Sequence, residues 1–239
     1  MNILAFDSCF AAVSAAVRRR SLLGEWAQHE TIEVGGGGNA ERLFQIITAV
    51  LDEAGLELAD VDRLAVTLGP GTFTGLRVGT AAARGLALAT GKPVVGASSL
   101  AVIAEQARRL APKLRAEPVA VAMDARRGAL YVQHFGSSGH EPVTEPALLT
   151  PEEAAGRICA TTDSNADIHV VGSGAEPLAD AIRTRGRRAR VQLTDIQPHA
   201  GALALMAPHL EPLARLTPIY LRQPDAKEPA KQPQYVAQP

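Results

Sequence analysis

Aromatic residues are scarce in this chain of 239 residues, which has five Phe, three Tyr and one Trp. An excess of either charge is also missing, because 24 Lys and Arg face 25 Asp and Glu and the formal net charge is -1. A protein that binds single-stranded nucleic acid on its own needs stacking aromatics beside a basic surface. The composition therefore argues against a self-sufficient RNA or DNA binder and predicts a core of small and branched aliphatic side chains.

Cysteine is nearly absent too, with Cys9 and Cys159 far apart in the sequence. Neither stands in a CxxC pair or in a zinc-like spacing, so we predict no disulfide framework and no structural metal. The apolar start is interrupted by Asp7 and precedes the basic run 18–20, the reverse of a secretory signal. We therefore expect a cytoplasmic protein that does not engage a membrane.

Recognised catalytic motifs are missing as well. The six histidines include no pair four residues apart, which removes HxxxH and HExxH, and there is no GxSxG elbow. The glycine-rich GPGTFTG at Gly69–Gly75 lacks the lysine of a Walker A loop and does not fit GxGxxG. No known hydrolase or transferase machinery is complete.

A pattern of elements occurs twice in the chain. The first half predicts strands over 2–7, 11–18, 22–30, 64–68 and 94–95 and helices over 39–54, 75–89 and 99–110, with the four glycines 35–38 as a mobile connector. The second half predicts strands over 118–124, 129–135, 147–149, 168–171 and 191–193, and helices from about 151, after 174 and over 198–210. This repeat favours an α/β fold of two related lobes, 1–112 and 113–223, followed by a flexible Pro-rich tail, 224–239.

Two acids stand at matching places in the repeat. Asp7 ends the first strand of one half and Asp124 ends the first strand of the other. Strand ends of an α/β sheet face a ligand crevice, so the pair could hold Mg²⁺ with a nucleotide between the lobes. Single acids at strand ends more often cap a turn, and we favour that interpretation.

The segment Gly69–Gly75 follows a buried strand and opens a helix, so its backbone N–H groups could receive an anion. Our candidate residues for contact with a nucleotide are Asp7, Thr72, Thr74 and Gly75. The competing interpretation, which we favour, is that Gly and Pro only shape the turn.

The helix after this segment carries small residues four positions apart: Gly75, Gly79, Ala83 and Ala87. Such a stripe allows close approach of another backbone, either the chain's own sheet or a partner helix. The preceding helix has bulky apolar residues on more than one face, such as Leu43 and Phe44, and this favours a partner.

Five arginines cluster at 183, 185, 187, 188 and 190. They could contact nucleic acid phosphates. Because Asp180 and Asp195 flank the cluster and the chain is nearly neutral, we favour a solvated helix end.

Five segments together carry a resemblance to a known family. They are ILAFDS at the N-terminus, LGPGTFTGLRVGTAAARGLAL at Leu68–Leu88, GASSL at Gly96–Leu100, MDARRGALY at Met123–Tyr131 and PIYLR at Pro218–Arg222. In this order, over almost the whole chain, they resemble the TsaB family, formerly YeaZ, of bacterial proteins required to make threonylcarbamoyladenosine in tRNA.

The resemblance implies an actin-like fold, similar to sugar kinases and Hsp70, with two RNase H-like lobes. It implies a non-catalytic scaffold or activator that binds and stabilises the TsaD transferase, with the TsaE ATPase joining the complex and tRNA contacted indirectly. It implies no cofactor of the chain's own, and ATP or ADP with Mg²⁺ only at the interface. Family members often have His where this chain has Asn39, which still suits a helix cap.

The same resemblance places the TsaD contact on the first two helices, Asn39–Ala54 and Gly75–Ala89. The interface residues that we expect are Leu43, Phe44, Ile47, Gly75, Arg77, Gly79, Ala83 and Leu86. An apolar partner face also makes a homodimer plausible when the chain is alone. The alternative function is a nucleotide-dependent phosphotransferase of the actin-like ATPase class, which the pair Asp7 and Asp124 motivates.

Overall fold

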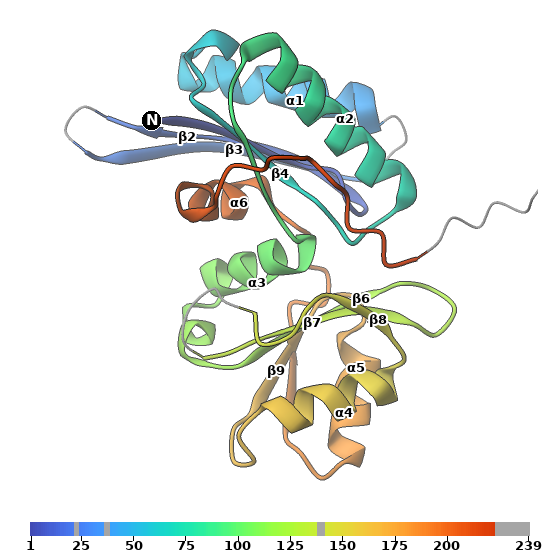
Figure 1. The fold of residues 1–239 in the computed structure, drawn as a ribbon. Helices are drawn as coiled ribbons and strands as arrows, with labels where there is room; N and C mark the ends of the chain where they lie inside the picture. The colour runs from blue at the N-terminus through green and yellow to red at the C-terminus, as the bar shows by residue number, and fades with distance from the viewer. Residues whose placement is uncertain (22–23, 36–38, 138–141, 223–239) are drawn as a thin grey trace, which may run out of the picture.

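The computed structural model describes residues 1–21, 24–35, 39–137 and 142–222, which form two five-stranded sheets (Figure 1). The first contains β1 (Asn2–Asp7), β2 (Ala12–Arg20), β3 (Trp26–Val34), β4 (Arg63–Thr67) and β5 (Val94–Ala97) in the order β3-β2-β1-β4-β5. The second contains β6 (Val119–Asp124), β7 (Leu130–Phe135), β8 (Ala147–Leu149), β9 (Ile168–Val171) and β10 (Ala189–Gln192) in the order β8-β7-β6-β9-β10. In each sheet the three consecutive strands pair antiparallel and the last two are parallel. The duplicated α/β pattern is therefore confirmed.

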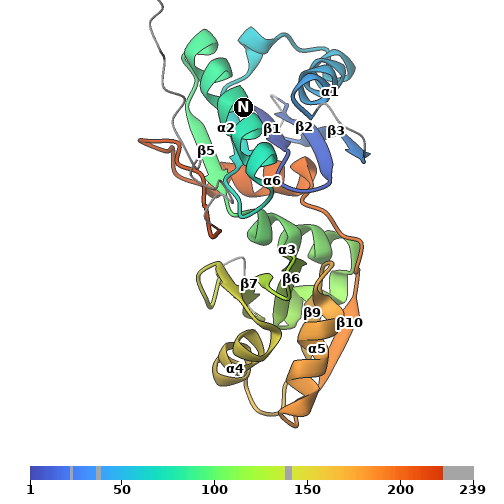
Figure 2. The ribbon, with the colours of Figure 1, turned by 90° about the vertical axis from the view of Figure 1, so that its right-hand side faces the viewer.

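Helices form layers on both faces of each sheet (Figures 1 and 2). On the outer face of the first sheet lie α1 (Asn39–Ala54) and α2 (Phe73–Thr90), and on the outer face of the second lie α4 (Pro151–Thr161) and α5 (Ala175–Thr184). Between the sheets lie α3 (Ser99–Leu110), which packs on β6 and β7, and α6 (Ala200–Met206), which packs on β1 and β2. Short 3-10 helices cover Leu58–Asp60, Pro112–Ala116 and Ala207–His209.

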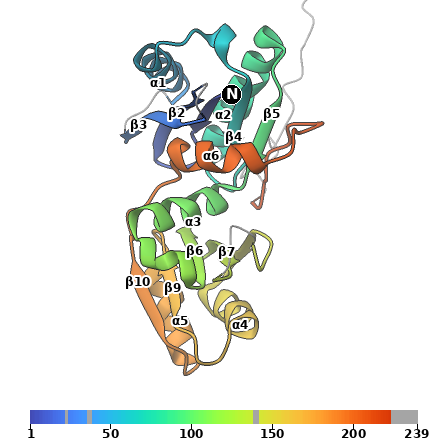
Figure 3. The same ribbon diagram turned by 90° about the vertical axis from the view of Figure 1, so that its left-hand side faces the viewer.

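The two inner helices, α3 and α6, lie next to each other between the two sheets (Figure 3). Leu203 of α6 belongs to the apolar cluster that contains Ile3 and Ala65 of the first sheet. After α6 the chain stays with this sheet, since Leu213 N–H donates to Val94 and Ile219 N–H donates to Leu68. The expected division into 1–112 and 113–223 thus separates the two sheets, but it does not describe the packing of residues 200–219.

Several element boundaries differ from the predicted ones for local reasons. The strand expected over 22–30 is β3 at Trp26–Val34, because Ser21 N–H donates to Glu25 and Gly24 adopts a φ of 86°, which places the hairpin turn later. The last helix ends its α-helical part at Met206, since Pro208 lacks an N–H and the chain continues as a 3-10 turn. The connector 36–38 and the tail 224–239 lie outside the described residues.

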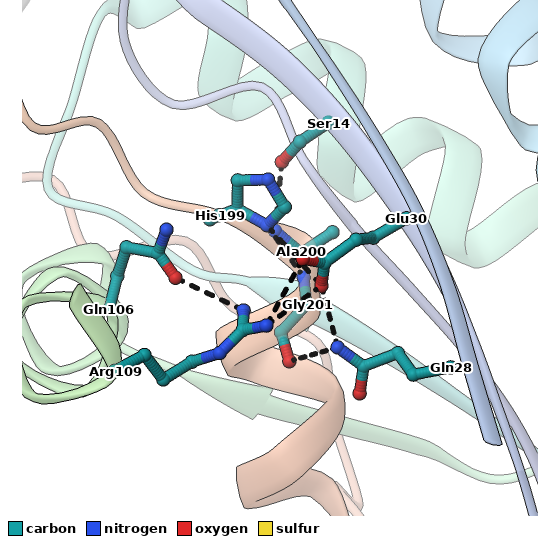
Figure 4. Close-up of polar contacts among 8 residues, drawn as sticks. All are labelled: Ser14, Gln28, Glu30, Gln106, Arg109, His199, Ala200 and Gly201. Atoms are coloured by element: carbon teal, nitrogen blue, oxygen red, sulfur yellow. Dashed lines mark hydrogen bonds and ion pairs between the residues drawn. The ribbon is translucent and has the colours of Figure 1, made fainter.

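A polar network ties β3 to the two inner helices (Figure 4). Glu30 accepts hydrogen bonds from Arg109 of α3 at 3.0 and 3.2 Å and from Gln28 at 2.6 Å. His199 caps α6 by accepting from the N–H of Gly201 at 3.0 Å. A Cβ at position 201 would overlap with the Glu30 carboxylate, so glycine allows α6 to begin against β3. The network joins β3 of the first sheet to α6 and to α3, which packs on the second sheet.

Candidate functional site between the lobes

A cavity of about 620 Å³ lies where the resemblance segments meet. The GPGTFTG segment and α2 contribute Gly71, Thr72, Phe73 and Leu76, and DARRGALY contributes Asp124, Ala125, Arg126 and Tyr131. The PIYLR segment supplies Ile219, Tyr220, Leu221 and Arg222, and Phe10 follows β1. Segments more than 200 residues apart in the sequence therefore build one site.

Aromatic rings form much of the cavity wall. Phe10 and Tyr131 meet edge to face with ring centroids 6.3 Å apart. Phe73 and Tyr220 are tilted with centroids 5.8 Å apart, and the Arg77 guanidinium lies 3.6 Å from the Phe73 ring centroid. The first pair is buried, whereas Phe73 is 37% and Tyr220 is 45% exposed, so the second pair lies at the opening.

Three charged residues complete the lining. Asp124 accepts a hydrogen bond at 2.7 Å from the N–H of Arg126 and so caps the β6–β7 turn, as the favoured interpretation predicted. Arg126 has a φ of 62°, a left-handed conformation that is costly for a residue with a Cβ. Arg222 donates from Nη2 to the carbonyl oxygen of Arg126 at 3.2 Å.

Asp7, the other acid of the predicted pair, lies beneath the surface at the end of β1 and is fully buried. Its Oδ1 accepts hydrogen bonds from the Thr67 hydroxyl and from the Cys9 N–H. The Cys9 thiol lies 3.1 Å from the Thr67 hydroxyl, and burial followed by the charge of Asp7 raises the pKa of Cys9 well above its usual value. Asp7 therefore caps a turn, and Cys9 stays a thiol rather than a nucleophilic thiolate.

The titration of the Asp7 carboxyl group should be visible in the pH dependence of the free energy of unfolding. Burial raises its pKa from 3.8 to about 6, against the hydrogen bonds from Thr67 and Cys9. Because the folded state favours the protonated carboxyl group, its contribution to stability is fully present below pH 3.8 and is lost as the pH rises through about 6. The free energy of unfolding falls by about 3 kcal/mol in total.

We expect Asp7→Asn to remove most of this loss. One carboxylate oxygen of Asp7 has no hydrogen-bond partner among the described residues, so the amide nitrogen that replaces it is unpaired. This cost limits the stabilisation of the variant relative to the wild type to about 1–2 kcal/mol at pH 8. Urea unfolding at pH 4, 6 and 8 should show the variant more stable than the wild type at pH 8 and not at pH 4. Parallel pH profiles for the two proteins would contradict this assignment.

The glycine loop is closely packed against the chain that follows β1. A Cβ on Gly71 would overlap with the carbonyl oxygen of Cys9, and one on Gly75 with that of Ser8, so both glycines serve close packing. Thr72 caps α2 by accepting from Gly75 N–H at 3.1 Å, which occupies a donor that a phosphate would need. Among the described residues, no group of three His, Cys, Asp or Glu could hold a metal ion. Thr74 is exposed and does not line the cavity.

The small-residue stripe of α2 faces the chain's own sheet. Gly79 lies so close to Ser8 that a Cβ added to this glycine would be 2.9 Å from the Ser8 hydroxyl, and Ala83 is completely buried in the core cluster of the first sheet. Most of the expected partner residues are likewise buried in the monomer: Leu43, Ile47, Gly75, Gly79, Ala83 and Leu86. The interpretation that this stripe receives a partner is therefore corrected, because a helix can pack only one partner on one face.

A second row of residues on these helices does face outward. On α2 it contains Arg77, Ala81, Gly85 and Leu88, of which Leu88 is 89% exposed, and a Cβ on Gly85 would meet open space. On α1 the exposed residues include Phe44, 48% exposed, and Thr48. We refer to Phe44, Thr48, Arg77, Ala81, Gly85 and Leu88 as the α1–α2 face. Of the expected interface residues, Phe44 and Arg77 belong to it.

The arginine cluster is used within its own lobe. Arg188 and Arg190 form ion pairs with Asp167, and Arg183 pairs with Asp180 at 2.8 Å. Arg187 donates to the carbonyl oxygens of residues 159, 162 and 163, which close the end of α4. These contacts agree with the favoured interpretation of a solvated helix end.

Comparison with known proteins relates this geometry to a family. A family model described as "TsaD: tRNA N6-adenosine threonylcarbamoyltransferase" matches residues 38–230. The chain is 34% identical over 156 residues to the Escherichia coli "tRNA threonylcarbamoyladenosine biosynthesis protein TsaB", and the aligned stretch spans 64% of each chain. It is 31% identical to an uncharacterized Mycobacterium tuberculosis protein over 95% of this chain and 94% of that one.

A solved structure agrees over nearly the full length. YeaZ from Pseudomonas aeruginosa superposes with a TM-score of 0.74 and 31% identity, over 92% of this chain and 99% of that chain. The chain belongs to the TsaB (YeaZ) family. A hexokinase from Thermus thermophilus, 14% identical with a TM-score of 0.50, shares the fold only. The expected actin-like architecture of the TsaB chain is confirmed by these likenesses.

Prediction from the sequence missed most of the cavity residues of this TsaB-family chain. Phe10, Tyr131, Tyr220, Arg126 and Arg222 were not site candidates, although four of them lie inside the resemblance segments DARRGALY and PIYLR. Their position inside segments that resemble one family was the signal that could have identified them.

In the part of the chain that the structure describes, none of the helices has the length and apolar character needed to span a membrane.

Proposed function

We propose that this TsaB-family chain takes part in the biosynthesis of threonylcarbamoyladenosine in tRNA, as a non-catalytic subunit that binds and stabilises the TsaD transferase. The observation that supports a partner is the α1–α2 face. Leu88 and Phe44 expose large apolar side chains there, and the small residues Ala81 and Gly85 lie on the same face of α2 as Leu88. Exposed apolar side chains beside small residues are suited to close packing of another helix.

The buried state of the reactive side chains supports a non-catalytic role. Asp7 and Cys9 are both enclosed and are joined through Thr67, which leaves them no contact with a substrate. Our proposal therefore assigns no cofactor to this chain and leaves ATP or ADP with Mg²⁺ to the surface that it shares with TsaD. In the same proposal TsaE joins this cytoplasmic complex, tRNA is contacted through TsaD, and the α1–α2 face supports a homodimer when TsaD is absent.

Association with TsaD is the direct test. We expect the purified chain and TsaD, mixed at micromolar concentration, to elute together from gel filtration with the mass of a 1:1 complex by light scattering. In parallel, calorimetric titration of the isolated chain with Mg-ATP should give no binding heat. Separate elution of the two proteins would refute the scaffold role, and tight Mg-ATP binding by the isolated chain would favour the phosphotransferase instead.

A further inference from the structure

The cavity between the lobes has a lining that scaffold function does not require. Thirteen residues line it, and four of them, Phe10, Phe73, Tyr131 and Tyr220, are among the nine aromatic residues of the whole chain. They come from four separate segments, so their meeting is a product of the fold. Concave sites of 300–1,000 Å³ lined by aromatic and apolar side chains are typical of small-molecule binding.

The polar side of the cavity is suited to a single negative charge. Arg126 and Arg222 line it together with Asp124, which leaves one net positive charge. The Nε of Arg222 is buried and has no hydrogen-bond partner among the described residues. The Arg222 guanidinium group lines the cavity, where an anion would form a charge-assisted hydrogen bond with it. Arg126 keeps its left-handed φ of 62° on the same wall, and such strained residues concentrate at functional sites.

The same wall disfavours a polyphosphate. Gly71 and Gly75 are packed on the backbone of Ser8 and Cys9, and Thr72 already holds the Gly75 N–H. The exposed Asp124 carboxylate would repel several phosphate charges placed beside it. The crevice in which α/β proteins bind nucleotides therefore favours, in this chain, a ligand with less negative charge than a nucleotide.

We propose that this cavity binds a small aromatic anion, a molecule with one or two rings that carries a single carboxylate or sulfonate group. Its rings lie between the Phe10–Tyr131 pair and the Phe73–Tyr220 pair, and its anionic group pairs with Arg222. This activity is distinct from association with TsaD, because the cavity lining and the α1–α2 face share no residue and touch where Arg77 lies against the Phe73 ring.

The probe 8-anilinonaphthalene-1-sulfonate, an aromatic monoanion that fluoresces when bound, tests the proposal on the intact chain. We expect saturable 1:1 binding to the wild type. Tyr220→Ala should weaken binding about tenfold through lost ring stacking, and Arg222→Met about tenfold or more through the lost charged hydrogen bond. Val143→Ala removes an apolar group outside the cavity that is 44% exposed, against 45% for Tyr220, so it is the matched control and should bind like the wild type.

Charge and competition separate this site from general surface binding. The uncharged N-phenyl-1-naphthylamine should bind the wild type and Arg222→Met equally, while naphthalene-2-sulfonate should displace the bound probe and Mg-ATP should not. Circular dichroism confirms that each variant is folded. The proposal is overturned by non-saturable binding, by equal affinity of Arg222→Met and the wild type for the anionic probe, or by displacement with Mg-ATP.

Discussion

Gly75→Ala is expected to lower the free energy of unfolding by about 3 kcal/mol, a large part of the 5–15 kcal/mol that is usual for a domain. The cause is a contact with rigid backbone. The added methyl group would overlap with the carbonyl oxygen of Ser8 and would lie 2.7 Å from the Thr72 hydroxyl that caps α2. Ser8 cannot move easily, because its hydroxyl also donates to the carbonyl oxygen of Gly75 at 2.8 Å. Thr72 is held in place because its hydroxyl accepts from the Gly75 N–H.

Gly85→Ala on the same helix is the matched control. A Cβ at position 85 meets open space, and alanine has a higher helix propensity than glycine. This variant should therefore be as stable as the wild type or more stable by up to about 1 kcal/mol. Chemical denaturation followed by circular dichroism measures both. Equal stability of the two variants would show that α2 does not approach the β1 end as closely as described.

Ala81→Trp is expected to weaken the complex with TsaD by about 100-fold or more while leaving the isolated chain folded. Ala81 lies in the exposed row of α2, so the indole ring would project outward and prevent close approach of a partner helix. The stability of the isolated chain should change by no more than about 0.5 kcal/mol, as is usual for exposed positions. Calorimetry or surface plasmon resonance with immobilised TsaD measures the loss.

Ala160→Trp provides the comparison, because Ala160 is also an exposed alanine, on helix α4 of the other lobe. This variant should bind TsaD like the wild type. If Ala160→Trp weakened binding and Ala81→Trp did not, the partner surface would lie on the second lobe. Equal binding by both variants would remove the α1–α2 face from the proposed interface while leaving association itself intact.

The α1–α2 face shows why these experiments do not target the stripe that the sequence favoured. Helix α2 has small residues on two faces, one with Gly75, Gly79 and Ala83 and another with Ala81 and Gly85. Spacing identifies both but does not tell which one meets the sheet. The decision depends on where Ser8 and Val66 lie, and these contacts join residues about 10 to 70 positions apart.

The cavity illustrates a similar limit. The aromatic residues Phe10, Phe73, Tyr131 and Tyr220 are isolated in the sequence and form no motif of their own. They meet because two sheets of equal topology face each other and because residues 213–219 return along β5 to the first lobe. The matching of Asp7 with Asp124 in the repeat was visible beforehand, but their environments were not: one is fully buried, and the other lines the cavity.

The sequence by itself determined the elements and their repetition. Apolar periodicity, a cap such as Ser98 and a breaker such as Gly91 act within a few residues, so the order of strands and helices in both halves could be predicted. Only the tertiary structure decided which face of α2 is buried, that α6 returns to the first sheet, and which side chains surround the cavity. These outcomes depend on contacts between distant segments, whose free energy no local pattern contains.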